Sequence, residues 1–189
     1  MTNLPAFEFK VVMIGAVAVG KTSIANRLQF QVFEDDYQPT IGAGYIPYKT
    51  EFNGKLVELQ IWDTAGMEKY KSLGSIYYRD SNAAILVYDQ SSQESADALD
   101  SWLNIFKSSV KSDVIIAVAA NKDDLPKKVV DNAKMEEWAN QQHYPFFVTS
   151  AKTGVGIQNL FNKIIELLME SATASSKEKI KLRSTKGCC

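Results

Sequence analysis

An apolar run that ends in a glycine-bounded loop constrains the fold of this chain more than any other feature. Phe7–Ile14 predicts a strand, Gly15–Thr22 matches the pattern G-x-x-x-x-G-K-[ST], and Thr22–Phe30 predicts a helix. In such a unit the backbone N–H groups of the loop can surround phosphate oxygens at the positive end of the helix. Lys21 can then contact the β- and γ-phosphates, and Thr22 can bind Mg²⁺. The loop predicts a nucleotide site, but ATPases, nucleotide kinases and GTPases all use it.

The remaining sequence alternates between expected strands and helices. Asn53-Gly54 predicts a tight hairpin, and Ser91 with Glu94 fits a capping box that opens a helix through about Ser109. We expect further strands at Tyr45–Phe52, Lys55–Trp62, Ala83–Tyr88, Val114–Ala120 and Phe146–Thr149, and further helices at Asp131–Gln142 and Ile157–Met169. This order predicts an α/β fold with a doubly wound, mostly parallel six-stranded sheet and one antiparallel edge strand. Ligands of such sheets bind at the carboxyl ends of the strands.

Length and composition indicate one globular domain followed by a short tail. The chain has 189 residues, 46% of them apolar, and a formal net charge of −1, so we expect no nucleic-acid partner. No apolar run approaches the ~18 residues that a membrane-spanning helix needs. Cys188 and Cys189 are the only cysteines and His143 is the only histidine, which excludes a disulfide framework and a histidine-based triad. We expect a domain over residues 1–171 and a flexible basic tail over 172–189.

A second motif predicts which base the nucleotide carries. Asn121-Lys122-Asp123-Asp124 follows a predicted buried strand. The Asp124 carboxylate can accept hydrogen bonds from N1–H and N2–H₂ of guanine, whereas adenine would leave the carboxylate unpaired. Lys122 can lay its aliphatic stem along the base, and a backbone N–H of Ser150-Ala151-Lys152 can meet the guanine carbonyl. The order of the motifs favours a guanine pocket over an ordinary polar turn.

These motifs together resemble the Ras superfamily of small GTPases, and within it the Rab family, most of all the early-endosomal subgroup. The resemblance covers Phe9 to about Met169 and the tail. It rests on Gly15–Thr22, Pro39–Gly42, Trp62–Gly66, Tyr77–Arg79, Asn121–Asp124 and Ser150–Lys152. It implies a P-loop G domain that binds GTP and GDP with Mg²⁺ and hydrolyses GTP.

The resemblance also implies roles for individual residues. Thr22, Thr40 and, through water, Asp63 would hold Mg²⁺, while Phe33 would pack against guanine beside Asn121, Lys122, Asp124, Ser150, Ala151 and Lys152. The phosphates would be bound by Gly15, Ala16, Val17, Ala18, Val19, Gly20, Lys21, Thr22, Ser23, Tyr37, Thr40 and Gly66. The catalytic set would be Lys21, Thr40, Gly66 and residue 67. Effectors would contact the aromatic triad Tyr45, Trp62 and Tyr77, in which family members usually carry Phe at the first position.

Two residues depart from the family pattern. Met67 occupies the place of the usual Gln, and a thioether cannot orient the attacking water. Val17 stands where a small residue is usual and would crowd the space near the γ-phosphate. We therefore expect slow intrinsic hydrolysis. The main interpretation is a regulated GTPase switch, the alternative is a GTP-binding membrane adaptor that cycles mainly by exchange, and Asp124 disfavours a nucleotide kinase.

The C-terminal residues predict membrane attachment. Segment 176–189 carries five basic residues and one acidic residue and ends in Cys188-Cys189. Two lipidated cysteines would supply the two anchors that stable binding needs, and the basic residues would attract anionic lipid. By the resemblance, the anchors are geranylgeranyl groups. We expect a monomer on the cytoplasmic face of an endosomal membrane and in the cytosol. Its expected partners are an exchange factor, an activating protein, effectors and a prenyl-binding escort protein of the GDI type.

Overall fold

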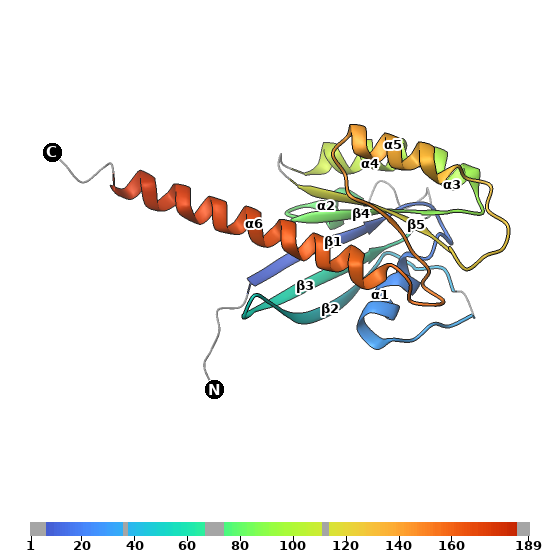
Figure 1. Ribbon diagram of the computed structural model, residues 1–189, viewed down its shortest axis with the longest axis horizontal. Coiled ribbons are helices and arrows are strands. Elements are labelled where there is room, and N and C mark those ends of the chain that lie inside the picture. The colour runs from blue at the N-terminus through green and yellow to red at the C-terminus, as the bar shows by residue number, and fades with distance from the viewer. Residues whose placement is uncertain (1–6, 36–37, 67–73, 111–113, 185–189) are drawn as a thin grey trace.

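The computed structural model describes residues 7–35, 38–66, 74–110 and 114–184 and shows a six-stranded sheet with helices on both faces (Figure 1). The strands lie in the order β2-β3-β1-β4-β5-β6. Their bounds are β1 Phe7–Ile14, β2 Ala43–Phe52, β3 Lys55–Thr64, β4 Ala83–Asp89, β5 Ile115–Asn121 and β6 Phe146–Val148. Only β2 is antiparallel to its neighbour among these strands. The predicted doubly wound fold is confirmed.

Each face of the sheet is covered by its own group of helices. On one face α1 (Lys21–Phe30) and the first part of α6 (Ile157–Ser184) pack on alternate residues of β1 such as Val11 and Met13. On the other face lie α2 (Gly74–Tyr78), α3 (Gln93–Asp97), α4 (Leu99–Ser109) and α5 (Asn132–Gln141). Neighbouring residues of β1 point to opposite faces of the sheet, so its apolar side chains contribute to a hydrophobic core on each face.

The β2–β3 hairpin turns where the sequence predicted it. Asn53 and Gly54 have φ values of 50° and 73°, the left-handed pair that a two-residue hairpin needs. The strands then pair from Phe52–Lys55 to Ala43–Thr64. Asp63 therefore lies at the carboxyl end of β3, beside the end of β1, and the hairpin delivers it to the site.

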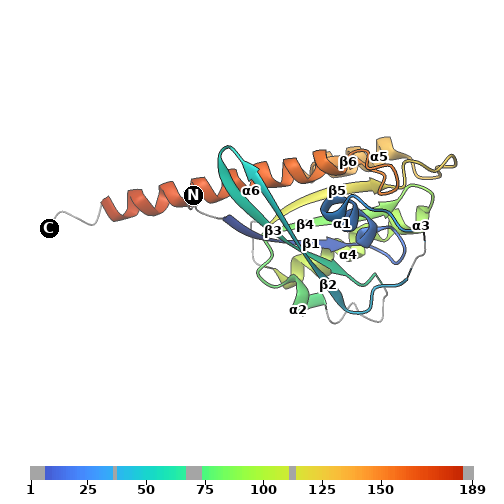
Figure 2. The same ribbon diagram turned by 90° about the horizontal axis from the view of Figure 1, so that it is seen from below.

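Two expectations about the helices differ from the structure. The cap of the helix after β4 is Ser92 and not Ser91, since the Ser92 hydroxyl accepts from the N–H of Ser95, and the predicted single helix is two helices that meet at Ala98. The helix predicted over Ile157–Met169 does not end at Met169. It continues to Ser184 and projects beyond the sheet (Figure 2). The alanines and charged residues after Ser171 have good helix propensity, which is compatible with this extension.

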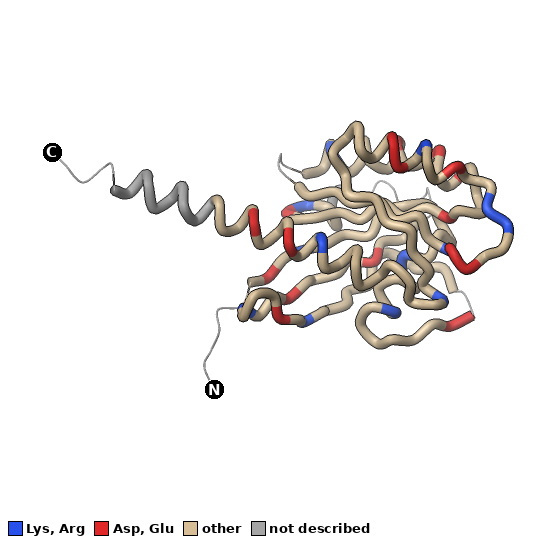
Figure 3. The backbone as a smooth tube through the Cα atoms, viewed as in Figure 1, with Lys and Arg blue, Asp and Glu red and all other residues tan. Residues whose placement is uncertain are grey.

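Basic and acidic residues are interspersed along the described backbone (Figure 3). Within the described residues, no helix combines the length and apolar character needed to cross a bilayer. Cys188 and Cys189, the expected lipidation sites, lie outside the described residues.

Candidate nucleotide-binding site

The glycine-bounded loop connects β1 to α1 and fits tightly between neighbouring strands. Gly15 has φ 147°, and a Cβ there would lie 2.2 Å from the carbonyl oxygen of Val87 on β4. Gly20 has φ 97°, and its Cβ would lie 2.3 Å from Nδ2 of Asn121 at the end of β5. Any side chain at either position would force the loop away from the sheet, so the two glycines fix its path.

Lys21 is buried within this loop. Its ammonium donates to the carbonyl oxygens of Gly15 and Ala16 at 2.9 and 2.8 Å. Burial lowers the pKa of Lys21 to about 8, while the negative charge of Asp63 opposes the change. The Lys21 ammonium is buried at the positive end of α1, and Asp63 only partly neutralises it. This arrangement strongly favours the binding of a polyphosphate.

Three oxygen-bearing side chains meet beside Lys21. The Thr22 hydroxyl donates to Oδ2 of Asp63 at 2.6 Å and lies 2.9 Å from the Thr40 hydroxyl, which itself donates to the same oxygen at 3.2 Å. Burial raises the pKa of Asp63, against the hydrogen bonds of the two threonines and the charge of Lys21. The other oxygen of Asp63 is buried with no hydrogen-bond partner among the described residues. This orphaned oxygen and the hard oxygen donors fit Mg²⁺.

Asn121 holds the phosphate loop (Gly15–Thr22) to the base loop (Ser150–Lys152). Its Nδ2 donates to the carbonyl of Val19 at 2.9 Å, and its Oδ1 accepts from the Thr149 hydroxyl and the Ala151 N–H, both at 3.2 Å. The side chain is 1% exposed. These hydrogen bonds brace the two loops against each other, and Asn121 also lines the pocket described below. Its predicted contact with guanine stays a prediction.

Replacing Asn121 by Ala should therefore destabilise the protein. The change leaves buried groups of Val19, Thr149 and Ala151 without their partner, which should lower the free energy of unfolding by about 1–3 kcal/mol. Urea unfolding at a fixed GDP concentration measures this difference. Asn104→Ala, on the exposed side of α4, is the control. Equal stability of the two variants would contradict the bracing role.

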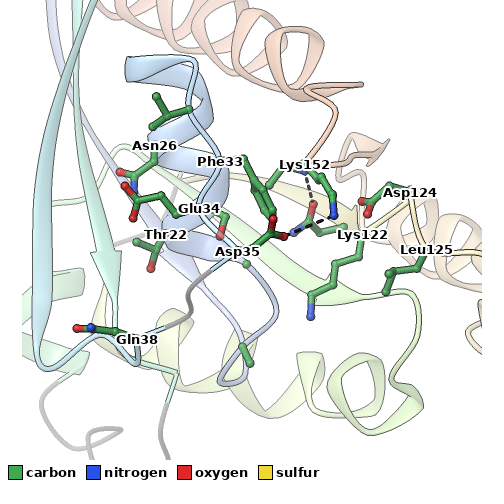
Figure 4. Close-up of a pocket in the computed structure, with 16 residues that line it drawn as sticks. Thr22, Asn26, Phe33, Glu34, Asp35, Gln38, Lys122, Asp124, Leu125 and Lys152 are labelled. Carbon is green, nitrogen blue, oxygen red and sulfur yellow. Dashed lines mark hydrogen bonds and ion pairs between the residues drawn. The ribbon is translucent and has the colours of Figure 1, made fainter.

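A pocket of about 740 Å³ extends from the phosphate loop to the base loops. Thr22 lies at one end of it and Lys122, Asp124 and Leu125 at the other (Figure 4). Asp124 accepts a hydrogen bond from the Ser150 hydroxyl at 2.6 Å, which leaves its second oxygen free to face a base. The size and the polar ends suit a ligand with a charged tail and an aromatic base.

Lys122 is oriented by a carboxylate that the sequence reasoning missed. Its ammonium lies 2.7 Å from Oδ2 of Asp89, the last residue of β4. Burial by itself would raise the pKa of Asp89, but the hydrogen bonds from Lys122 and Ser91 and the charge of Lys122 lower it below its ordinary value. The position of Asp89 at the carboxyl end of a predicted central strand was the signal that could have identified it.

The segment after α1 forms a wall of the pocket. Phe33 is half-buried and packs on the core, and the Lys152 ammonium lies 5.8 Å from the centre of its ring. Lys152 also forms an ion pair with Asp35 at 3.5 Å. Figure 4 shows Phe33, Asp35 and Lys152 together between α1 and the base loop. Phe33 thus lines the same end of the pocket as Lys152, and its packing against guanine stays a prediction.

Gly66 and Val17, two of the predicted phosphate-binding residues, lie close together. A Cβ on Gly66 would lie 2.4 Å from the backbone of Ala16 and 2.5 Å from the N of Val17, so only glycine fits this approach. The Val17 side chain is 43% exposed and is not among the residues that line the pocket. Tyr37 and Met67, predicted phosphate and catalytic positions, lie outside the described residues.

The predicted effector triad is contiguous. The rings of Tyr45 and Trp62 are 5.8 Å apart with their planes at 71°, and those of Trp62 and Tyr77 are 6.1 Å apart. Tyr45 is 49% exposed. The Lys10 ammonium lies 4.7 Å from the Trp62 ring on the strand side. The cluster joins the β2–β3 hairpin to α2, and its role in effector binding stays a prediction.

Comparisons with known proteins identify the family. The Ras family model matches residues 10–170. The chain is 41% identical over 163 residues to Ras-related protein Rab-5B of Plasmodium falciparum (isolate 3D7), covering 86% of this chain and 78% of that protein. It is 37% identical over 175 residues to Ras-related protein Rab-21 of Homo sapiens, covering 92% and 78%. It is also 37% identical over 172 residues to Ras-related protein Rab-5A of Dictyostelium discoideum, covering 90% and 86%. Because these matches cover most of its length, the chain belongs to the Ras family of small GTPases and is a GTP-binding member of the Rab type.

Proposed function

We propose that this protein is a GTP/GDP-dependent switch in vesicular membrane trafficking whose unaided GTP hydrolysis is slow. The observation that best supports a switch is the position of the Thr40 hydroxyl, which contacts both Thr22 and Asp63. Thr40 belongs to the segment that leads from Phe33 into β2, where Tyr45 begins the aromatic surface. The segment that carries the Thr40 hydroxyl therefore connects the proposed phosphate site to the aromatic surface that a partner would contact.

The proposed conformational change follows from this connection. In the GTP state the Thr40 hydroxyl and the Gly66 N–H would have oxygen partners on the γ-phosphate and at the metal. Mg²⁺, when bound by Thr22, Thr40 and water near Asp63, would neutralise phosphate charge. After hydrolysis Thr40 and Gly66 lose those partners, and the loops that carry them loosen. The aromatic triad would then lose the arrangement that effectors recognise.

Thr40→Ala should separate the two nucleotide states. The loss of one hydroxyl contact should weaken binding of a non-hydrolysable GTP analogue roughly 10- to 100-fold, by the value of a hydrogen bond to a charged group. GDP, which has no γ-phosphate, should bind as in the wild type. Equilibrium binding of both nucleotides measures this, with Thr50→Ala on the distal part of β2 as the control. Equal weakening of both nucleotides, or equal affinity of the wild type for ATP, would contradict the proposal.

Membrane attachment and partner exchange complete the proposed cycle. The basic tail and its two terminal cysteines support anchoring by two prenyl groups at the cytoplasmic surface of a membrane. The resemblance to the early-endosomal Rabs favours an endosome as that membrane. An exchange factor, an activating protein and an escort protein of the GDI type would then control the nucleotide and the location. No nucleic acid takes part, and the chain acts as a monomer.

A second candidate is a GTP-binding membrane adaptor that barely hydrolyses and cycles mainly by nucleotide exchange. Met67 and Val17 favour it, because both occupy positions next to the reacting phosphate in the family pattern. The intact arrangement of Lys21, Thr22, Thr40 and Asp63 favours the regulated GTPase. The two candidates differ in one property, the hydrolysis rate of bound GTP with and without an activating protein.

A further inference from the structure

Arg27 makes three hydrogen bonds to backbone carbonyls on two separate segments. Its Nε donates to the carbonyl of Ala151 at 2.8 Å and its Nη2 donates to that of Lys152 at 2.6 Å. Its Nη1 donates to the carbonyl of Gln31 at 2.7 Å. Arg27 itself lies on α1, is partly buried, and is not among the residues that line the pocket.

The three carbonyls belong to the two segments that form the base end of the pocket. Gln31 ends α1 with φ 58°, and Phe33 follows two residues later. Ala151 and Lys152 belong to the base loop, in which the Ala151 N–H already donates to Asn121. The ion pair between Lys152 and Asp35 joins the same two segments on the solvent side, but both side chains are more than half exposed, so it contributes little.

We infer that Arg27 is a positioning residue that holds the Phe33 segment and the base loop together and thereby sets how long guanine nucleotide stays bound. The inference rests on the proposed nucleotide switch. A guanidinium is suited to the task because it is planar and always charged, and it presents several donors in a fixed geometry. Lysine at this position has one ammonium on a flexible stem and cannot reach three carbonyls in these directions.

Two variants test the inference. In Arg27→Met the apolar stem stays and all three donors are lost, while Arg27→Lys keeps the charge and one donor group. We expect release of fluorescently labelled GDP to be roughly 10- to 100-fold faster in Arg27→Met and less accelerated in Arg27→Lys, because small displacements of positioning groups have effects of this size. Arg79→Met, an exposed arginine after α2 on the opposite face of the sheet, is the control and should release GDP at the wild-type rate.

A second readout separates positioning from general damage to the fold. The single-turnover hydrolysis rate of GTP already bound should be unchanged in both Arg27 variants, because Arg27 contacts no group at the phosphate end. GDP and IDP, which differ only in the 2-amino group that Asp124 would read, should be released faster by the same factor. Wild-type release from both variants, or release and hydrolysis changed by the same factor, would overturn the role of Arg27. A wild-type protein that binds no guanine nucleotide would overturn the proposed function itself.

Discussion

Replacing Asp124 by Asn should change the base preference of the pocket from guanine to xanthine. The Asp124 carboxylate has one oxygen occupied by the Ser150 hydroxyl and faces the base end of the pocket. As an acceptor only, it suits the N1–H and N2–H₂ donors of guanine. An asparagine amide presents one acceptor and one donor. The donor would oppose the 2-amino group of guanine and would match the 2-carbonyl of xanthine.

The expected size of this change is large, because a polar site rejects a ligand that leaves its groups unpaired by about 10⁴–10⁵. We expect the ratio of GDP to XDP affinity to fall by roughly this factor in Asp124→Asn, measured by competition against fluorescently labelled nucleotides of both kinds. Asp123→Asn is a matched control, since the neighbouring carboxylate forms an ion pair with Lys128. Unchanged guanine preference in Asp124→Asn would show that another group reads the base.

The sequence predicted the elements whose local signals agree with their tertiary environment. β1, β4 and β5 are apolar along most of their lengths and are buried on both faces, and the Asn53-Gly54 turn has one favourable geometry. Because parallel strands place their carboxyl ends at one edge, Asp63 and Asn121 could be expected near the phosphate loop from their positions after strands. The Thr40 hydroxyl lies beside Thr22 and Asp63, and the metal-binding role that the resemblance implied for it stays a prediction.

The parts that the sequence did not predict depend on contacts between distant segments. Arg27 lies on an ordinary helix, and its function appears only when the carbonyls of Ala151 and Lys152, more than 120 positions away, reach its guanidinium. The predicted role of Asn121 at the base gave no indication that its amide also joins two loops through backbone groups. Backbone acceptors carry no sequence signal, so a side chain that binds them cannot be recognised from its pattern.

GTP bound to the wild-type protein should be hydrolysed slowly, and Met67→Gln should increase the single-turnover rate by ~10²–10³, the usual effect of one preorganised transition-state contact. A methionine thioether is a weak acceptor with no donor, so it cannot hold water in line with the γ-phosphate. Glutamine offers both an acceptor and a donor at the same chain position, next to Gly66, whose backbone packs against Ala16. Met135→Gln adds the same amide on α5, which covers the face of the sheet opposite to α1, and serves as the control. It should leave the hydrolysis rate unchanged.

Val17→Gly tests the second departure separately. The backbone nitrogen of Val17 lies at the close approach of Gly66 to the phosphate loop, and the Val17 side chain is partly exposed. Removal of that side chain should make room for a water or for a partner's side chain. If Met67→Gln alone speeds hydrolysis, the missing amide limits the rate. If hydrolysis becomes faster only when Met67→Gln and Val17→Gly are combined, the crowding by Val17 prevents glutamine from reaching the water. If the wild type already matches Met67→Gln, another group positions the water, GTP is short-lived without a partner, and the adaptor alternative loses its support.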